Sequence, residues 1–146
     1  PQETGMHYLD RVETDWPFRI QMPRGFNVPF HCTASGKTFM ASLSKSAREK
    51  FIAGLSLEAH THNTHTTADS LLKNLKLNAK RGFALDDEEF VEGMVAAAVP
   101  VTDNKGRFVA ALAVHGPKQR LSIAQATAYV DCLHSAADRL KHAVFS

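Results

Sequence analysis

The chain has 146 residues, which suits one globular domain, and its composition excludes several classes of protein. It is 44% hydrophobic and 22% charged, a balance that does not fit intrinsic disorder. The formal net charge is +2, with lysines and arginines scattered, so the sequence lacks the basic stripe of a nucleic-acid-binding domain. Two cysteines do not make a disulfide framework, and no run reaches the roughly 18 apolar residues of a membrane span. We therefore expect one domain located in the cytoplasm.

The first third of the chain predicts two strands. Residues 6–12 (MHYLDRV) and 18–22 (FRIQM) place apolar side chains at alternate positions, as half-buried strands do. Residues 23–25 (PRG) are a turn signal. This segment is predicted to form a hairpin that leads into the first helix.

The next segment predicts two helices. The periodicity of residues 34–43 is helical, and either Thr33 or Ser35 could cap the start of this helix. The spacing of Ser46 and Glu49 is that of a capping box, which predicts the start of a second, short helix.

The rest of the chain predicts a helix, a strand with an acidic turn within residues 81–90 (RGFALDDEEF), a strand hairpin and a long last helix. Residues 71–79 are amphipathic, and Gly82 follows where a left-handed helix stop is needed. Residues 94–101 and 107–114 are nearly continuous apolar runs, joined by a turn with Gly106 at a position of positive φ. Strands of this kind are usually covered on both faces or line a cavity.

A second capping box, at Ser122 and Gln125, opens the last helix, whose predicted buried stripe ends at Leu140. The order of elements is dominated by hairpins and lacks βαβ alternation. It predicts an α+β fold, an antiparallel sheet with helices packed on its faces.

Two features allow a nucleotide-binding or a catalytic interpretation. The tetrapeptide SGKT at residues 35–38 resembles part of a P-loop, but His31 stands where a P-loop needs glycine. Cys32 paired with a histidine could act as a nucleophile in a stand-alone enzyme. Neither a G-x-S-x-G elbow nor a C-x-x-C motif supports such chemistry. We expect no catalytic residue.

A metal-binding interpretation rests on the loop EAHTHNTH, where His60, His62 and His65 lie close together in sequence. Imidazoles at this spacing could ligate zinc, but no thiol or carboxylate completes a recognised pattern. We expect solvated loop histidines, no metal and no cofactor, and keep a zinc-binding module as an alternative.

An anion-binding interpretation rests on the small residues Ala34, Ser35 and Gly36 at the predicted start of a helix. The first amides of a helix have no intrahelical partner, and they point outward at the positive end of its dipole. A carboxylate can bind there without a nearby lysine, and small side chains let it approach the backbone.

Four motifs together resemble the effector-binding domain of the IclR family of bacterial transcription regulators. In chain order they are YLDRVET at 8–14, PFHCTASGKTFMASL at 29–43, THNTHTTADSL at 61–71, and RGFALDDEEFVEGM at 81–94 with the apolar hairpin that follows. Each motif alone is weak, but four in register cover nearly the whole chain.

The resemblance implies that residues 1–146 form a GAF-like, non-catalytic domain that binds a small organic acid effector. It implies a winged helix-turn-helix domain upstream of this chain, through which DNA is bound, and a homodimer or homotetramer. It also implies a set of ligand-binding residues: Ala34, Ser35, Asp86, Met94, Ala96, Ala113 and His115.

Departures from the family pattern concern the predicted pocket. Ala96 and Ala113 stand where small-acid binders of the family carry polar side chains, and His115 stands at a serine position. Losing hydroxyl or thiol donors would leave a very small acid poorly hydrogen-bonded. The sequence therefore predicts a larger organic acid, with aromatic acids included, whose carboxylate binds the amides of Ala34 and Ser35.

Overall fold

The computed structural model describes residues 1–15 and 25–146. In chain order their helices and strands are β1 (Met6–His7), β2 (Asn27–Val28), α1 (Ala34–Ser42), α2 (Lys45–Ala53), α3 (Ala68–Arg81), β3 (Ala84–Asp87), β4 (Met94–Thr102), β5 (Phe108–Pro117), α4 (Ile123–Ala128) and α5 (Val130–Phe145). The predicted α+β class with an antiparallel sheet is confirmed.

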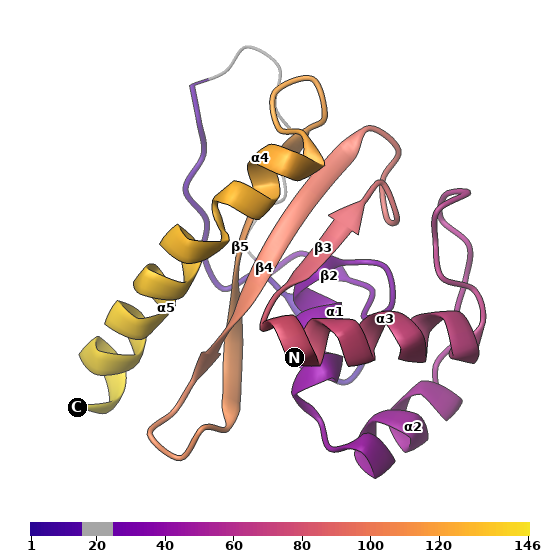
Figure 1. Cartoon of the computed structure of the whole chain (residues 1–146), viewed down its shortest axis with the longest axis horizontal. Helices are drawn as coiled ribbons and strands as arrows, with labels where there is room; N and C mark the ends of the chain where they lie inside the picture. The colour runs from indigo at the N-terminus through magenta and orange to yellow at the C-terminus, as the bar shows by residue number, and fades with distance from the viewer. Residues whose placement is uncertain (16–24) are drawn as a thin grey trace.

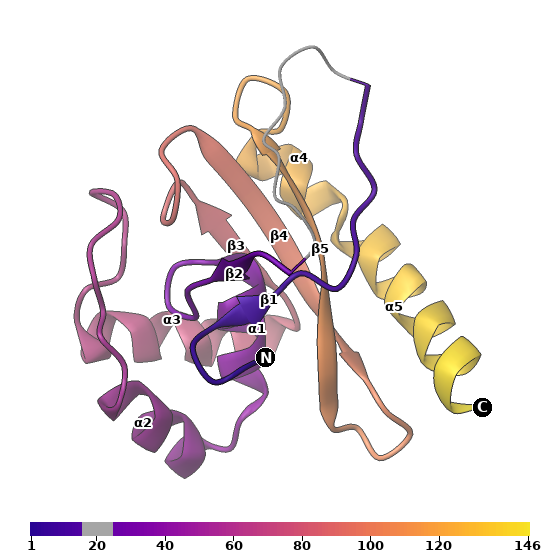
Figure 2. The same ribbon diagram turned by 180° about the vertical axis from the view of Figure 1, so that it is seen from behind.

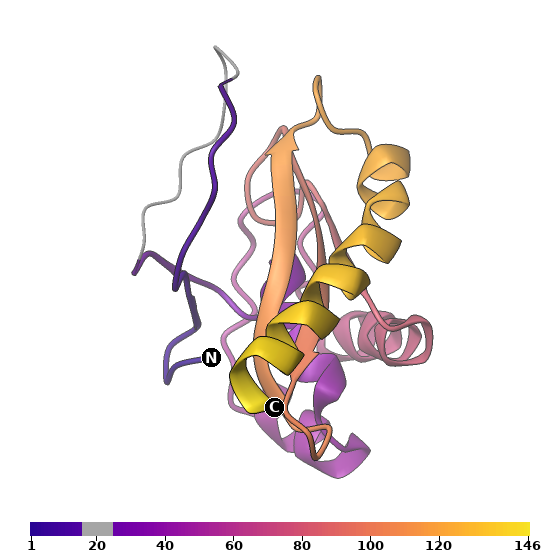
Figure 3. The same cartoon turned by 90° about the vertical axis from the view of Figure 1, so that its left-hand side faces the viewer.

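The sheet has the order β3-β4-β5 and lies between two helical layers (Figures 1 and 3). Side chains alternate along a strand, so the long central strand β4 supplies both layers. Ala97 and Val99 contact the layer formed by α4 and α5, whereas Ala96 and Ala98 contact Ala34 at the start of α1. This confirms that the apolar run of β4 is covered on both faces.

A second apolar cluster fills the space between α1, α2, α3 and the N-terminal strands. Its buried members are Met6, Val28, Phe30, Met40, Ile52, Leu71, Leu75 and Met94. The rings of Phe30, Phe39 and Phe51 pack edge to face or tilted, with centroids 5.0–5.6 Å apart. This packing fixes α1 and α2 relative to each other.

The first N-terminal strand is shorter than the predicted span of residues 6–12. Among the described residues, Met6–His7 pairs with Asn27–Val28, and the pairing ends in two backbone hydrogen bonds that Tyr8 makes with Phe26 and Gly25. This pair lies on the α1 side of the sheet, as Figure 2 shows. The predicted strand over residues 18–22 lies outside the described residues.

The helix ends follow local hydrogen bonding. Thr33 is the N-cap of α1, and its hydroxyl accepts from the Gly36 amide. The prediction that Ser46 starts α2 is wrong, because Ser44 comes first and already caps the Ala47 amide. Gly82 ends α3 with φ 82°, as predicted.

The last helix starts at the predicted capping box, where Ser122 and Gln125 satisfy each other's backbone amides. It is interrupted at Tyr129, which separates α4 from α5. Leu140 was predicted to be buried, which is wrong, because its side chain is 44% exposed.

We predict that Gly36→Ala destabilises the protein by roughly 2–4 kcal/mol, despite the better helix propensity of alanine. A Cβ at Gly36 would lie 2.7 Å from the carbonyl carbon of Phe30 and closer still to its oxygen. These are backbone atoms, which cannot move aside cheaply. Urea unfolding measures the effect.

The matched control is Gly54→Ala, since Gly54 has φ −91° and its Cβ would meet nothing nearer than 3.6 Å. We expect that change to alter the unfolding free energy by about 0.5 kcal/mol or less. Equal effects of the two substitutions would show that α1 does not depend on its close approach to Phe30.

Candidate functional site

Three of the predicted site residues form one row across the sheet. Asp86 in β3 pairs with Ala96 in β4, which pairs with His115 in β5. Paired residues of neighbouring strands point to the same face. All three therefore face the side of the sheet that carries α1 and the N-terminal strands.

Asp86 is 1% exposed and only half satisfied. Its Oδ1 accepts a hydrogen bond from the Glu89 amide at 2.7 Å, whereas Oδ2 is buried without a partner among the described residues. Burial raises the pKa of Asp86 to about 7; the amide hydrogen bond opposes this shift, and the nearby charge of Glu89 adds to it. Near neutral pH this carboxyl can donate as well as accept a hydrogen bond.

His115, at the other end of the row, is also incompletely paired. Its Nδ1 is buried with no partner in the part of the chain that is described. The Tyr8 ring stacks on the imidazole, with centroids 6.4 Å apart and planes at 14°. Burial lowers the pKa of His115, so its imidazole stays neutral at physiological pH. Burial and the charge of Asp86 raise the pKa of Tyr8.

The N-terminus of α1 ends beside this row, because Ala34 contacts Ala96 and Ala98. Thr33 accepts from the Gly36 amide through its side chain and from the Lys37 amide through its carbonyl. No acceptor for the amides of Ala34 and Ser35 is found within residues 1–15 and 25–146. Two donors thus remain at the positive end of the helix.

Lys37, the lysine of the SGKT tetrapeptide, is not available to a phosphate. It is 1% exposed, and its Nζ lies 2.8 Å from both carboxylate oxygens of Glu89. Glu89 also accepts from the Asp87 amide. This buried ion pair excludes the P-loop interpretation and ties α1 to the turn after β3.

The remaining two predicted residues lie at the edges of this face. Met94 is buried in the apolar cluster of the N-terminal strands. Ala113 pairs with Ala98 and shares its face of the sheet, but it is exposed. The structure therefore groups Ala34, Asp86, Ala96 and His115 closely, with Met94 as apolar wall and Ala113 towards solvent.

A half-open hollow of about 350 Å³ lies elsewhere, between the ends of α1 and α3. Its lining includes Thr38, Asn78, Gly82 and Pro100 and no ionisable side chain. It contains none of the predicted site residues and offers a charged ligand no charged partner.

The histidine loop is held in place rather than solvated throughout. The Thr64 hydroxyl donates to the Glu89 carbonyl at 2.6 Å and accepts from the His60 amide at 3.0 Å. His65 hydrogen-bonds Ser70 and lies 3.6 Å from Glu89, and His62 is exposed. His60, His62 and His65 are therefore not brought together.

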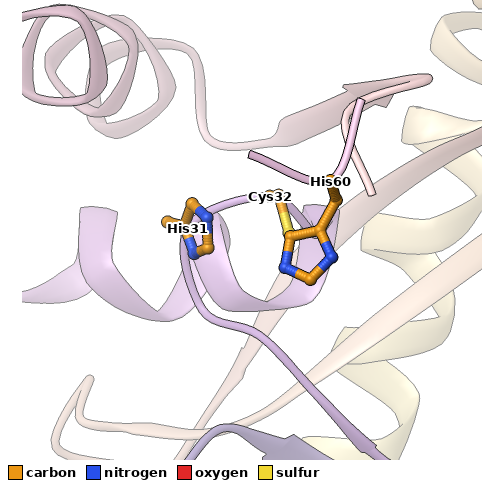
Figure 4. A group of neighbouring side chains, drawn as sticks. All are labelled: His31, Cys32 and His60. Carbon is orange, nitrogen blue, oxygen red and sulfur yellow. The ribbon is translucent and has the colours of Figure 1, made fainter. Parts of the chain in front are cut away.

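His60 instead meets two residues that precede α1. Ligand atoms of His31, Cys32 and His60 all lie within 4.8 Å of one another (Figure 4). Burial raises the pKa of the Cys32 thiol to about 12, with the nearby charges of Asp86 and Glu89 adding to the shift. A buried, protonated thiol is inert, which argues against a nucleophilic role.

Sequence reasoning missed Tyr8, the Lys37–Glu89 pair and the convergence of His31, Cys32 and His60. Tyr8 opens the first of the four motifs, and that position was its one available signal. The other contacts join residues far apart in the chain, and no spacing rule points to them.

Comparison with known proteins shows which family the chain belongs to. The sequence-family model described as bacterial transcriptional regulator IclR C-terminal matches residues 2–142 of this chain. The regulator SauR of Cupriavidus necator is 43% identical over 133 residues, covering 91% of this chain and 53% of SauR. The repressor IclR of Escherichia coli is 32% identical over 114 residues, covering 78% of this chain and 42% of the repressor. The chain spans about half the length of the curated relatives it matches.

Solved structures agree with this assignment. The Thermotoga maritima IclR structure superposes with a TM-score of 0.87 at 27% identity, over 96% of this chain and 57% of that one. A double mutant of the Acinetobacter PobR inducer-binding domain, in complex with 3-hydroxybenzoic acid, superposes with a TM-score of 0.79 at 26% identity, over 90% of this chain and 73% of that one. The relatives are transcriptional regulators and not enzymes. No helix of the described residues has the length and apolar character needed to cross a membrane. The chain belongs to the IclR family of bacterial transcriptional regulators and matches their C-terminal domain.

Proposed function

We propose that this domain binds a small organic acid and thereby controls DNA binding by a winged helix-turn-helix domain of the full-length regulator. The ligand's carboxylate accepts hydrogen bonds from the amides of Ala34 and Ser35. Its body lies along the sheet face between Asp86 and His115, against Met94, Ala96 and Ala113. The proposal is one of binding, with no reaction.

The observation that carries the proposal is a pair of buried atoms on one row of the sheet, Asp86 Oδ2 and His115 Nδ1, which have no partner in the part of the chain that the structure describes. A buried polar group without a partner costs about 1–3 kcal/mol, so two on one row are unusual unless a ligand pairs them. The free amides of α1 lie at the same place, since Ala34 contacts Ala96. Donors, acceptors and a positive helix end thus lie on the same face of the sheet.

The chemistry of these groups favours an acid with a polar substituent at some distance from the carboxylate. The amides take the anion. Asp86 can donate to, or accept from, a hydroxyl, and neutral His115 can do the same. Ala96 contributes only a methyl group between them. Hydroxylated aromatic acids have this layout, and the hydroxybenzoate complex of the related PobR domain supports this class.

Transmission to DNA follows from the N-terminal segment. Tyr8 stacks on His115 and directly follows β1, whose pair with β2 lies on the α1 side of the sheet (Figure 2). A ligand that shifts His115 shifts Tyr8 with it, and so changes the segment that leads towards the N-terminal half of the regulator. A coupling of about 1–3 kcal/mol changes affinity roughly 5–150-fold, which is enough for control of an operator. We expect a homodimer or homotetramer to carry this change.

Calorimetry with paired ligands tests the proposal. We expect a hydroxylated aromatic acid to bind, its neutral carboxamide to bind at least tenfold more weakly, and acids of two carbons to bind poorly. Equal binding of acid and amide would refute the carboxylate contact. Tight binding of glyoxylate with inert aromatic acids would refute the predicted ligand size.

The amide contact is tested by Ala34→Pro. Proline is tolerated at the first position of a helix, and the extended backbone of Thr33 (φ −115°, ψ 149°) suits a residue before proline. The substitution removes one donor, and we expect affinity for the acid to fall roughly tenfold to hundredfold with the fold retained.

Ala68→Pro is the matched control. It makes the same change at the first position of α3, after a Thr67 cap of nearly the same geometry (φ −121°, ψ 148°). We expect unchanged affinity for the acid in this variant. Unchanged affinity in Ala34→Pro, with the fold intact by circular dichroism, would contradict the proposed contact.

We predict that Asp86→Asn weakens ligand binding and removes a loss of stability that the parent shows as pH rises. The pKa of Asp86 rises from 3.8 to about 7 on folding, so between about pH 4 and pH 7 the folded protein binds the extra proton and stability falls as pH rises. Asparagine abolishes this fall. We expect the free energy of unfolding of the variant minus that of the parent to be roughly 2–4 kcal/mol larger, meaning a relatively more stable variant, at pH 8 than at pH 4.

An unpaired side-chain amide of the new asparagine lowers the free energy of unfolding by the same amount at both pH values. This cost therefore cancels when the two pH values are compared. Ligand affinity should fall in Asp86→Asn, because the carboxyl is lost from the site. Asp87→Asn, at the exposed neighbouring position, should change neither quantity. A pH-independent effect of Asp86→Asn would show that the carboxyl does not titrate as described.

A further inference from the structure

We propose that His31, Cys32 and His60 form a binding site for a thiophilic metal cation of the zinc class. One nitrogen from each imidazole and the Cys32 sulfur lie within 4.8 Å of one another, and the three side chains approach from two separate segments (Figure 4). Within the described residues this is the group of histidine, cysteine and acidic side chains that meets this criterion. The site is separate from the proposed carboxylate contact, and its test does not depend on an effector.

The hydrogen bond of His31 favours metal ligation. Its Nε2 lies 2.8 Å from the carbonyl oxygen of Glu58. A carbonyl can only accept, so Nε2 carries the proton and donates, which leaves the lone pair on Nδ1. Metal-ligating histidines commonly donate their other ring N–H to a backbone carbonyl in this way, which fixes both tautomer and ring orientation.

The three ligands are also held by their surroundings. His31 and Cys32 are buried in the bend that leads to the Thr33 cap of α1. The His60 amide donates to Thr64 at 3.0 Å, and its ring packs against His31 and Phe90 with centroids 5.8 and 5.4 Å away. His60 is exposed, so a cation has an entry path from solvent.

The donor set selects the kind of cation. Two imidazoles and a thiolate suit zinc and related borderline or soft ions, whereas calcium and magnesium require oxygen ligands. Tetrahedral zinc places its ligands about 3.4 Å apart, so the group must close by roughly 1 Å. The exposed His60 ring can make this movement.

Binding requires the Cys32 thiol to release its proton to solvent, after which the thiolate sulfur bonds the cation. The carboxylates of Asp86 and Glu89 lie near enough to act on this sulfur electrostatically. These negative charges disfavour a bare thiolate but favour a dication bound to it. Three protein ligands would leave the fourth tetrahedral position for a water molecule or an anion.

Cobalt(II) and zinc titrations of the chain, purified without a polyhistidine tag and stripped with a chelator, test the inference. We expect one Co²⁺ per chain, with a sulfur-to-cobalt charge-transfer band and tetrahedral d–d absorption, displaced by one Zn²⁺. Cys32→Ser should abolish the charge-transfer band. His31→Gln and His60→Gln should each weaken Zn²⁺ binding roughly a hundredfold or more.

Two variants serve as matched controls. His62→Gln lies in the same loop as His60, and Cys132→Ser changes the other free cysteine, which is exposed. Both should bind Zn²⁺ and give the same spectrum as the parent chain. Because Cys32 is buried and its variant can misfold, His60→Gln, with its exposed side chain, decides the matter. Parental affinity in His60→Gln, loss of binding in His62→Gln, or no cobalt spectrum in the folded parent would each overturn the proposal.

Discussion

The arrangement of the α1 side of the sheet depends on the buried ion pair of Lys37 and Glu89, in which the lysine Nζ lies 2.8 Å from each carboxylate oxygen. The pair joins α1 to the turn after β3, across 52 positions of sequence. Buried pairs add little net stability, but loss of one partner leaves an uncompensated charge that costs about 3–5 kcal/mol. The geometry is therefore strongly enforced. Glu89 also directs its own amide to Asp86, so the residue that fixes the helix also orients the carboxyl beside it.

Around this enforced geometry the same face of the sheet breaks the rule that buried polar atoms are paired. Asp86 presents one oxygen and His115 one nitrogen without partners among residues 1–15 and 25–146, although the opposite face of β4 is packed with apolar side chains. Proteins tend to break such local rules at functional sites, where a ligand supplies the missing partner. The two faces of β4 thus differ in composition: Val95, Ala97, Val99 and Val101 pack in the cluster with α4 and α5, whereas the small side chains of Ala96 and Ala98 face the start of α1.

The sequence predicted those features that depend on neighbours in the chain. The β4–β5 hairpin, with Gly106 at φ 76°, and the helix stop at Gly82 follow from backbone conformations that glycine adopts readily. Ser46 misled because Ser44 offered a competing cap two residues earlier, and Leu140 misled because helical periodicity alone does not reveal which apolar positions of a helix tertiary packing covers. The site divides in the same way. The amides of Ala34 and Ser35 could be inferred from a local helix start, but the burial of Lys37 and the stacking of Tyr8 on His115 arise only from tertiary packing.

The two proposed sites meet at one end of α1, and this imposes a relation between them. Cys32 and Ala34 flank the Thr33 cap, so a cation that draws the sulfur towards His60 acts on the same turn whose amides face the effector. Asp86 is common to both proposals, because its charge acts on Cys32 and its Oδ2 is offered to the proposed effector. A dication near that carboxyl favours its ionised form and so opposes hydrogen-bond donation from it to an anionic ligand, while favouring the anion through its own charge. Whichever effect is larger, reciprocity requires that the factor by which metal changes effector affinity equals the factor by which effector changes metal affinity. If that factor favours binding, the two ligands act together on this face of the sheet, and if it disfavours binding, they compete.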